Sequence, residues 1–91
     1  MRKLLFFHAS WCSPCRFYER EFIQPLEECV GAGPIQHVDA QRHPFLADRY
    51  LIDKLPTVVL LEHTGEVKAK RTGAIDVDWV AAWLKGGEGF D

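Results

Sequence analysis

Apolar residues gather along the chain in short runs that predict β-strands, separated by polar turns and by segments with helical spacing. Two of these runs are apolar at nearly every position, which is typical of strands that are buried on both faces. A later run alternates between apolar and polar residues and predicts an edge strand after a Thr64-Gly65 turn. The predicted strands cover residues 3–9, 35–39, 57–62 and 67–72.

The longest helical pattern runs over residues 13–30. Its apolar stripe repeats every four residues, at Tyr18, Phe22, Leu26 and Val30. Cys29 lies close to this stripe, so we expect it to be a small buried apolar residue. Pro25 lies inside the pattern and predicts a kink, because proline lacks the N–H group that the helix needs.

Two shorter helices are predicted at residues 45–50 and 77–85. Asp76 can cap the second of them, which turns Val80, Trp83 and Leu84 inward. The element order is therefore β-α-β-α-β-β-α. The first strand–helix–strand unit favours a parallel pair, and the later hairpin requires an antiparallel pair. We predict an α/β fold with a four-stranded mixed sheet and helices on both faces.

Length and charge narrow the class of protein. The 91 residues suffice for one domain (1–91), and the glycine-rich end at 86–91 is expected to be a flexible tail. A net charge of -2, with both signs interspersed, predicts neither a nucleic-acid partner nor a membrane partner. The apolar run at residues 4–7 is too short for a signal peptide or a membrane span. We therefore expect a cytoplasmic monomer.

The candidate chemistry lies in Cys12-Ser13-Pro14-Cys15, where the first strand gives way to the first helix. A helix N-terminus offers unpaired N–H groups and the positive end of the helix dipole, and both favour a thiolate at Cys12. Cys15 follows one turn later, within bonding reach. We expect Cys12 to be the exposed nucleophile and Cys15 to be the deeper, resolving thiol.

A Cys-x-x-Cys pair can also be half of a zinc site. Zinc needs four ligands, which a second close pair of cysteines or histidines usually completes. In this chain the histidines stand singly, and Cys29 has no near partner in the sequence. The sequence therefore favours redox chemistry, with no metal and no bound cofactor.

Four segments resemble the thioredoxin family, and they occur in the family's order; one of them, Gly65-Glu66-Val67, resembles the hairpin turn that follows the family's third strand. Residues 7–16 resemble its active-site segment, with Trp11 before the first cysteine. Leu55-Pro56-Thr57 resembles its cis-proline loop, and Thr72-Gly73-Ala74 its glycine loop. The family's first strand and helix have no counterpart here, so the resemblance implies a minimal, glutaredoxin-sized thioredoxin fold.

The resemblance also implies a groove in which an extended segment of a client protein docks beside Cys12. The implied partners are disulfide-containing clients and either thioredoxin reductase or a small-thiol reductant. The groove residues would be Trp11, Ser13, Pro14, Leu55, Pro56, Thr72, Gly73 and Ala74.

Two departures from the family concern proton transfer. Phe6 stands where the family usually has a buried aspartate that deprotonates the resolving thiol, and His8 stands where it usually has tryptophan. We hypothesise that His8, or else His37 or a water molecule, accepts this proton, since an imidazole group can gain and lose a proton near physiological pH. The alternative is that His8 merely packs beside the helix.

Taken together, these features predict a protein-disulfide reductase. The reducing direction follows from the expected cytoplasmic location. Two alternatives stay open: a glutaredoxin-like protein that glutathione reduces, and a non-catalytic adaptor that uses the same groove.

Overall fold

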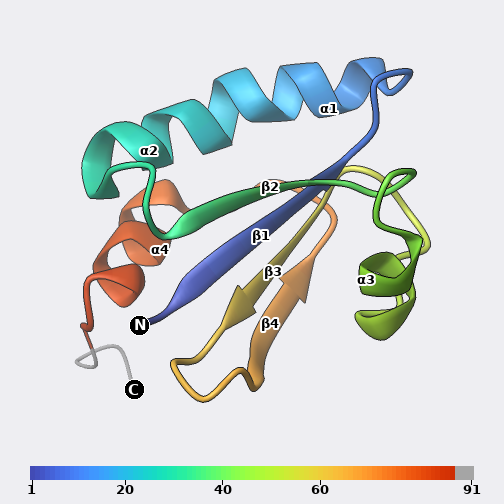
Figure 1. Cartoon of the computed structure of the whole chain (residues 1–91). Coiled ribbons are helices and arrows are strands. Elements are labelled where there is room, and N and C mark those ends of the chain that lie inside the picture. Colours follow the sequence, from blue (N-terminus) through green and yellow to red (C-terminus); the bar gives the residue numbers. More distant parts are fainter. Residues whose placement is uncertain (88–91) are drawn as a thin grey trace.

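A computed structural model describes residues 1–87 and shows one sheet with helices on both of its faces (Figure 1). The strand order is β2-β1-β3-β4. β1 pairs with β2 in parallel, and the β1–β3 and β3–β4 pairs are antiparallel. This is the mixed sheet that the sequence predicts. The strands are β1 (Lys3–His8), β2 (Ile35–Asp39), β3 (Thr57–Leu61) and β4 (Val67–Arg71).

Three helical segments follow one another without a break between β1 and β2 (Figure 1). They are α1 (Ser13–Tyr18), the π-helical turn η1 (Glu19–Ile23) and α2 (Gln24–Val30). In η1 the N–H group of Gln24 donates to the carbonyl of Glu19, five residues earlier. The irregularity that Pro25 predicts is therefore this wide turn, which immediately precedes the proline.

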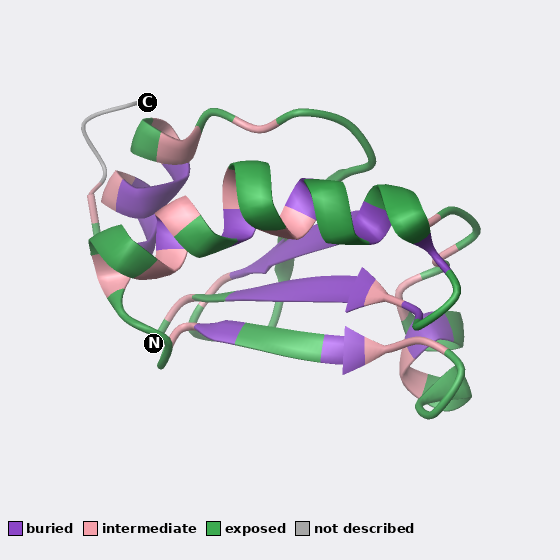
Figure 2. Ribbon diagram, turned by 90° about the horizontal axis from the view of Figure 1, so that it is seen from above, coloured by how far each residue is buried: buried purple, intermediate pink, exposed green. Residues whose placement is uncertain are grey.

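Two further helices complete the fold: α3 (Pro44–Arg49) and α4 (Val77–Leu84). Alternate residues of β1 divide the core in two, because successive strand residues point to opposite faces. Leu4 and Phe6 lie in a cluster with residues of α1, α2 and α4, and Phe7 lies in a second cluster with α3. β3 is buried throughout and β1 is buried at its four central positions (Figure 2), which confirms the prediction of strands that are buried on both faces.

The prediction that Cys29 is buried is wrong, because its side chain is exposed. Leu26 of the predicted stripe is buried as expected, and Ile23, which lies outside the stripe, is buried as well. The π-helical turn supplies the reason: it inserts one extra residue, so the buried face of α2 is displaced by one position from the face that continues regularly from Cys15.

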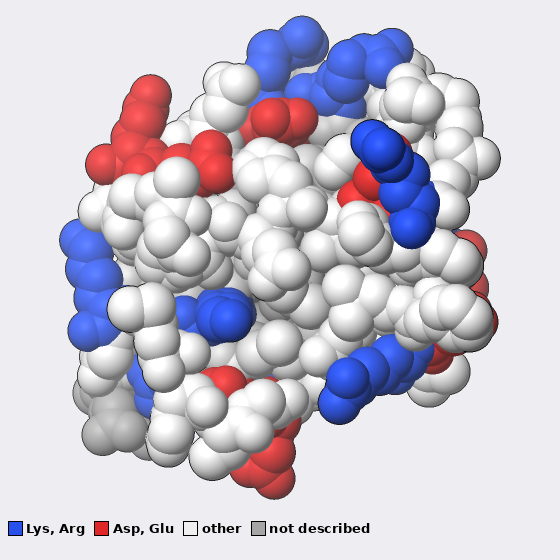
Figure 3. Space-filling view, in the orientation of Figure 1, with Lys and Arg blue, Asp and Glu red and all other residues white. Residues whose placement is uncertain are grey.

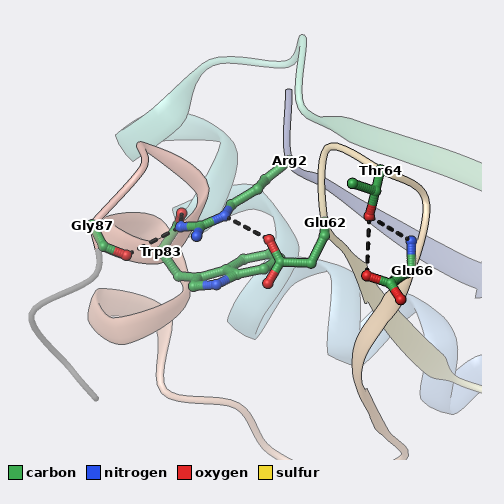
Figure 4. Close-up of polar contacts among 6 residues, drawn as sticks. All are labelled: Arg2, Glu62, Thr64, Glu66, Trp83 and Gly87. Atoms are coloured by element: carbon green, nitrogen blue, oxygen red, sulfur yellow. Dashed lines mark hydrogen bonds and ion pairs between the residues drawn. The ribbon is translucent and has the colours of Figure 1, made fainter.

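α4 is held at both ends. Asp76 caps its start, as predicted, by accepting a hydrogen bond from the Trp79 backbone N–H at 3.0 Å. At its end, Arg2 donates to the carbonyls of Trp83 (2.7 Å) and Gly87 (3.1 Å) and pairs with Glu62 (3.1 Å; Figure 4). Gly86 and Gly87 also bond back to α4 through their N–H groups. The rest of the predicted tail, 88–91, lies outside the described residues.

Basic and acidic side chains are interspersed on the face shown in Figure 3, with uncharged surface between them. Among residues 1–87, no helix has the length and apolar character needed to cross a membrane.

Candidate active site

Cys12 and Cys15 are joined by a disulfide, with Cα atoms 5.3 Å apart. The bond lies at the start of α1, directly after the loop that leaves β1. The structure thus shows the oxidised form of the predicted pair. Its dithiol form would hold two electrons and two protons that can pass to another disulfide.

Cys12 is the N-cap residue of α1, and its Sγ accepts a hydrogen bond from the Cys15 backbone N–H at 3.2 Å. A negative sulfur at this position would be stabilised by that donor and by the helix dipole. The expectation of an exposed Cys12 above a deeper Cys15 is wrong for this form, because the two residues are 3% and 2% exposed. The Cys12 sulfur turns back over the first turn of the helix and away from solvent.

The loop before Cys12 is tied in place by its backbone. The N–H group of Cys12 donates to the Ala9 carbonyl (3.1 Å), and Arg16 donates to the Ser10 carbonyl (3.0 Å). Trp11 projects from this fixed loop with 65% of its surface exposed. A large apolar side chain beside the disulfide suits contact with a partner.

The predicted cis-proline loop carries a cis peptide bond between Leu55 and Pro56, immediately before β3. Leu55 packs against the core cluster that contains both cysteines. The Thr57 hydroxyl donates to the Lys54 carbonyl at 2.6 Å and fixes the turn. The cis peptide bond implied by the resemblance is therefore present, and Leu55 joins the loop to the cluster to which Cys12 and Cys15 belong.

Residues 72–74 are exposed, as a docking edge requires. Tyr18 of α1 holds this loop, because its hydroxyl donates to the Gly73 carbonyl at 2.9 Å. Burial raises the pKa of Tyr18 to about 12, so the hydroxyl stays protonated and remains a donor at neutral pH. The sequence pattern identified Tyr18 as a core residue but missed this anchoring role. The signal was available, since a buried tyrosine hydroxyl needs a hydrogen-bond partner.

Phe6 lies at the centre of an aromatic group on the cysteine side of the sheet. Its ring centroid is 5.3 Å from that of His8 and 5.6 Å from that of His37, and the two imidazoles are 6.2 Å apart. His37 also bonds to Glu27 of α2 at 2.9 Å. His8 is half-buried and His37 is exposed. The structure therefore brings both candidate proton acceptors to one face of the sheet.

Within the part of the chain that the structure describes, no three His, Cys, Asp or Glu side chains are grouped so as to hold a metal ion. His43 and His63, which stand singly in the sequence, are exposed.

Known proteins match this chain over most of its length. Residues 2–86 match the family model described as Thioredoxin. A mitochondrial thioredoxin of Mus musculus is 33% identical over 79 residues, which cover 87% of this chain and 47% of that protein. The chloroplastic thioredoxin M3 of Oryza sativa is 35% identical over 72 residues, which cover 79% and 41%. The chain thus spans less than half the length of these two relatives.

The architecture agrees with solved thioredoxin structures. A thioredoxin-2 of the malaria parasite superposes with a TM-score of 0.78 over 96% of this chain and 84% of that one, at 24% identity. This likeness concerns the fold, and the family model adds the sequence. The cysteine pair, the cis-proline loop and the matched residues agree with one another, and the chain belongs to the thioredoxin family.

Proposed function

We propose that this chain is a thiol–disulfide oxidoreductase that reduces disulfides in client proteins. The observation that carries the proposal is the Cys12–Cys15 disulfide at the N-cap of α1, where the Cys12 sulfur already accepts a hydrogen bond. That environment favours the thiolate, which is the attacking form in disulfide exchange.

The reaction consists of two displacements. The Cys12 thiolate attacks one sulfur of the client disulfide, a Cys12–client bond forms, and the other client sulfur leaves as a thiolate. Cys15 then loses its proton and attacks the Cys12 sulfur, which forms the Cys12–Cys15 bond and releases the second client thiolate. Two electrons pass to the client, and two protons complete its dithiol. A reductase or a small thiol returns the two electrons to the enzyme.

Docking of the client is assigned to the surface around the disulfide. We assign three segments to this surface: Trp11, Ser13 and Pro14 next to the cysteines in the sequence, Leu55 and Pro56 of the cis-proline loop, and residues 72–74. The side chains of Arg16, Thr57 and Tyr18 donate hydrogen bonds to backbone carbonyls that lie in or next to these segments. A fixed edge of this kind suits an extended client segment that binds through its main chain.

Proton transfer from Cys15 is assigned to His8. Support comes from its half-buried position on β1, on the sheet face that also packs against Cys12 and Cys15. His37 is the weaker candidate, since Glu27 already occupies its Nε2 atom. In single-turnover reduction, His8→Gln should lower the rate of the second displacement and change the dependence of that rate on pH. His43→Gln, at an exposed histidine, is the control. Identical pH profiles for His8→Gln and wild type would exclude His8.

The activity itself is tested by insulin reduction with dithiothreitol. Wild type should accelerate it, Cys12→Ser should abolish the acceleration, and Cys15→Ser should accumulate a mixed disulfide on Cys12. Cys29→Ser is a matched control, because Cys29 is exposed and lies outside the disulfide. Two results would contradict the assigned roles: loss of activity in the Cys29→Ser variant, or accumulation of a mixed disulfide with insulin in the Cys12→Ser variant.

The upstream reductant is tested separately. We propose that thioredoxin reductase with NADPH reduces the Cys12–Cys15 bond, with the expected monomer acting in the cytoplasm. Reduction by glutathione and glutathione reductase, but not by thioredoxin reductase, would support the glutaredoxin-like alternative. If neither system reduces the Cys12–Cys15 bond, and the chain binds client proteins but does not reduce insulin, these results would support the non-catalytic adaptor.

A further inference from the structure

A cavity of about 390 Å³ lies between the β3–β4 hairpin and α4. Val58 and Leu60 of β3 form part of its lining, and Trp79 and Val80 of α4 form another part. Cavities that hold small organic molecules have volumes of about 300–1,000 Å³ and mostly apolar walls. The volume and lining of this cavity match that description.

The charged residues of the lining are two cations, Lys68 and Arg71, and one carboxylate, Asp76. Asp76 is already engaged, because it accepts the Trp79 backbone N–H at the start of α4. Arg71 donates a hydrogen bond to the carbonyl of the neighbouring Lys70, at 2.9 Å, and has no ion pair within the described residues. Within residues 1–87, the structure gives the Lys68 ammonium no hydrogen bond or ion pair. The lining therefore has an excess of positive charge.

A β-bulge brings Lys68 to this position. Val67 pairs with Leu61 and Ala69 pairs with Leu60, so Lys68 is an extra residue in β4. Regular alternation would place Lys68 with Lys70, on the other face of the sheet, where the Lys70 ammonium bonds to carbonyls at the end of α3. The bulge instead places Lys68 in the cavity lining with Arg71.

We propose that this cavity binds a small amphipathic anion, whose aliphatic or aromatic body lies against the apolar wall and whose carboxylate or sulfonate meets Lys68 and Arg71. Ala74 lines the cavity and also belongs to the predicted client groove, so the two sites adjoin without sharing the cysteines. Binding in the cavity requires no thiol chemistry, and its test does not depend on the oxidoreductase proposal.

The probe is 1-anilinonaphthalene-8-sulfonate, whose fluorescence rises in apolar sites. Titration uses the Cys12→Ser/Cys15→Ser protein, with excitation of tryptophan, because Trp79 lines the cavity and can transfer energy to the bound probe. Decanoate below its micellar concentration then competes with the probe, in parallel with uncharged decanol. We expect one probe molecule to bind, and decanoate to displace it at a concentration about tenfold lower than decanol.

The Lys68→Gln/Arg71→Gln variant separates charge recognition from apolar burial. Both residues are exposed, so the fold should be retained. We expect its decanoate affinity to fall about five- to tenfold, its decanol affinity to stay unchanged and its preference for the anion to disappear. Lys3→Gln, at an exposed lysine outside the lining, should behave as wild type. Ala69→Leu, which fills the cavity, should weaken both ligands.

Three results would overturn the proposal. If decanoate and decanol displace the probe from the wild-type protein at equal concentrations, the cavity is an apolar site that does not recognise the anion. Unchanged decanoate affinity in the double variant would place the anion elsewhere. Absence of probe binding, while circular dichroism shows a native fold, would remove the site altogether.

Discussion

Arg2 joins the two ends of the described chain, and its replacement should destabilise the fold more than any ordinary surface substitution. Its guanidinium lies over the Trp83 ring, 4.6 Å from the centroid, and bonds to the Trp83 and Gly87 carbonyls and to Glu62 (Figure 4). Those carbonyls lie at and just beyond the C-terminus of α4. The last carbonyls of a helix lack N–H donors from a following turn, and the helix dipole favours positive charge there. α4 in turn covers the core cluster that contains both cysteines.

The magnitude follows from the exposure of each contact. The Arg2 and Glu62 side chains are 15% and 28% exposed, so their ion pair contributes about 0.5 kcal/mol. The two bonds to carbonyls contribute about 1 kcal/mol each, and the contact with the ring about 0.5 kcal/mol. Ordering of the long side chain offsets about 1 kcal/mol of this gain. Arg2→Ala should therefore lower the free energy of unfolding by about 2 kcal/mol.

Urea unfolding of the reduced protein, followed by circular dichroism, measures this loss. In a domain of this size the melting temperature should fall by about 10 °C. Arg2→Lys should lose about half as much, because it keeps the charge but not the planar fork, and Glu62→Gln should lose about 0.5 kcal/mol. Arg20→Ala, at an exposed arginine of η1, is the control. Equal stability of Arg2→Ala and Arg20→Ala, or an equal loss in Glu62→Gln and Arg2→Ala, would contradict the stabilising role of the Arg2 contacts with α4.

Three further predictions concern the helices and the docking surface. Because the pKa of Tyr18 is raised to about 12, the folded state holds this proton where an unfolded tyrosine loses it, so stability should fall between pH 10 and pH 12. Urea titrations should show a smaller decline in this range for Tyr18→Phe. Asp76→Ala removes the N-cap of α4 and should cost about 1 kcal/mol, whereas Asp76→Asn should cost much less, as measured by thermal unfolding. Trp11→Ala should lower kcat/KM for insulin several-fold while the rate with a small aromatic disulfide changes by less than twofold; equal losses would assign Trp11 to the chemistry.

Local sequence signals were sufficient for most of this fold. The apolar runs of β1 and β3 predict burial on both faces directly, and Asp76 marks the start of α4 through capping chemistry. The position of the cysteine pair also followed from the strand-to-helix change. The orientation of the Cys12 sulfur did not follow, because it depends on a hydrogen bond within the first turn of α1. The Lys68 bulge was hidden for a similar reason: β4 alternates in sequence, and only its register against β3 reveals the extra residue.

The misplacement of Cys29 has a physical cause that can itself be tested. Cys15 and Tyr18 mark the inward face before the π-helical turn, Phe22 and Ile23 lie within the turn, and Leu26 marks the inward face after it. In a regular helix Cys29 would lie on the same face as Cys15. The residue inserted by the turn rotates the inward face of α2 by about 100°. Sequence alone could not choose between the two phases, because Phe22 and Ile23 are adjacent and both apolar.

Deletion of one exposed residue within the turn should therefore be tolerated. Removal of Glu21 lets the segment become a regular α-helix in which Ile23 and Leu26 fall into phase with Cys15 and Tyr18. We expect a loss of stability below about 1 kcal/mol, small for a deletion inside a helix. Deletion of Glu28, which lies after the turn, should cost more, because it rotates Val30 away from the core and displaces the helix end at Gly31. Equal losses in urea unfolding of the two deletions would show that the π-helical turn does not set the phase of α2.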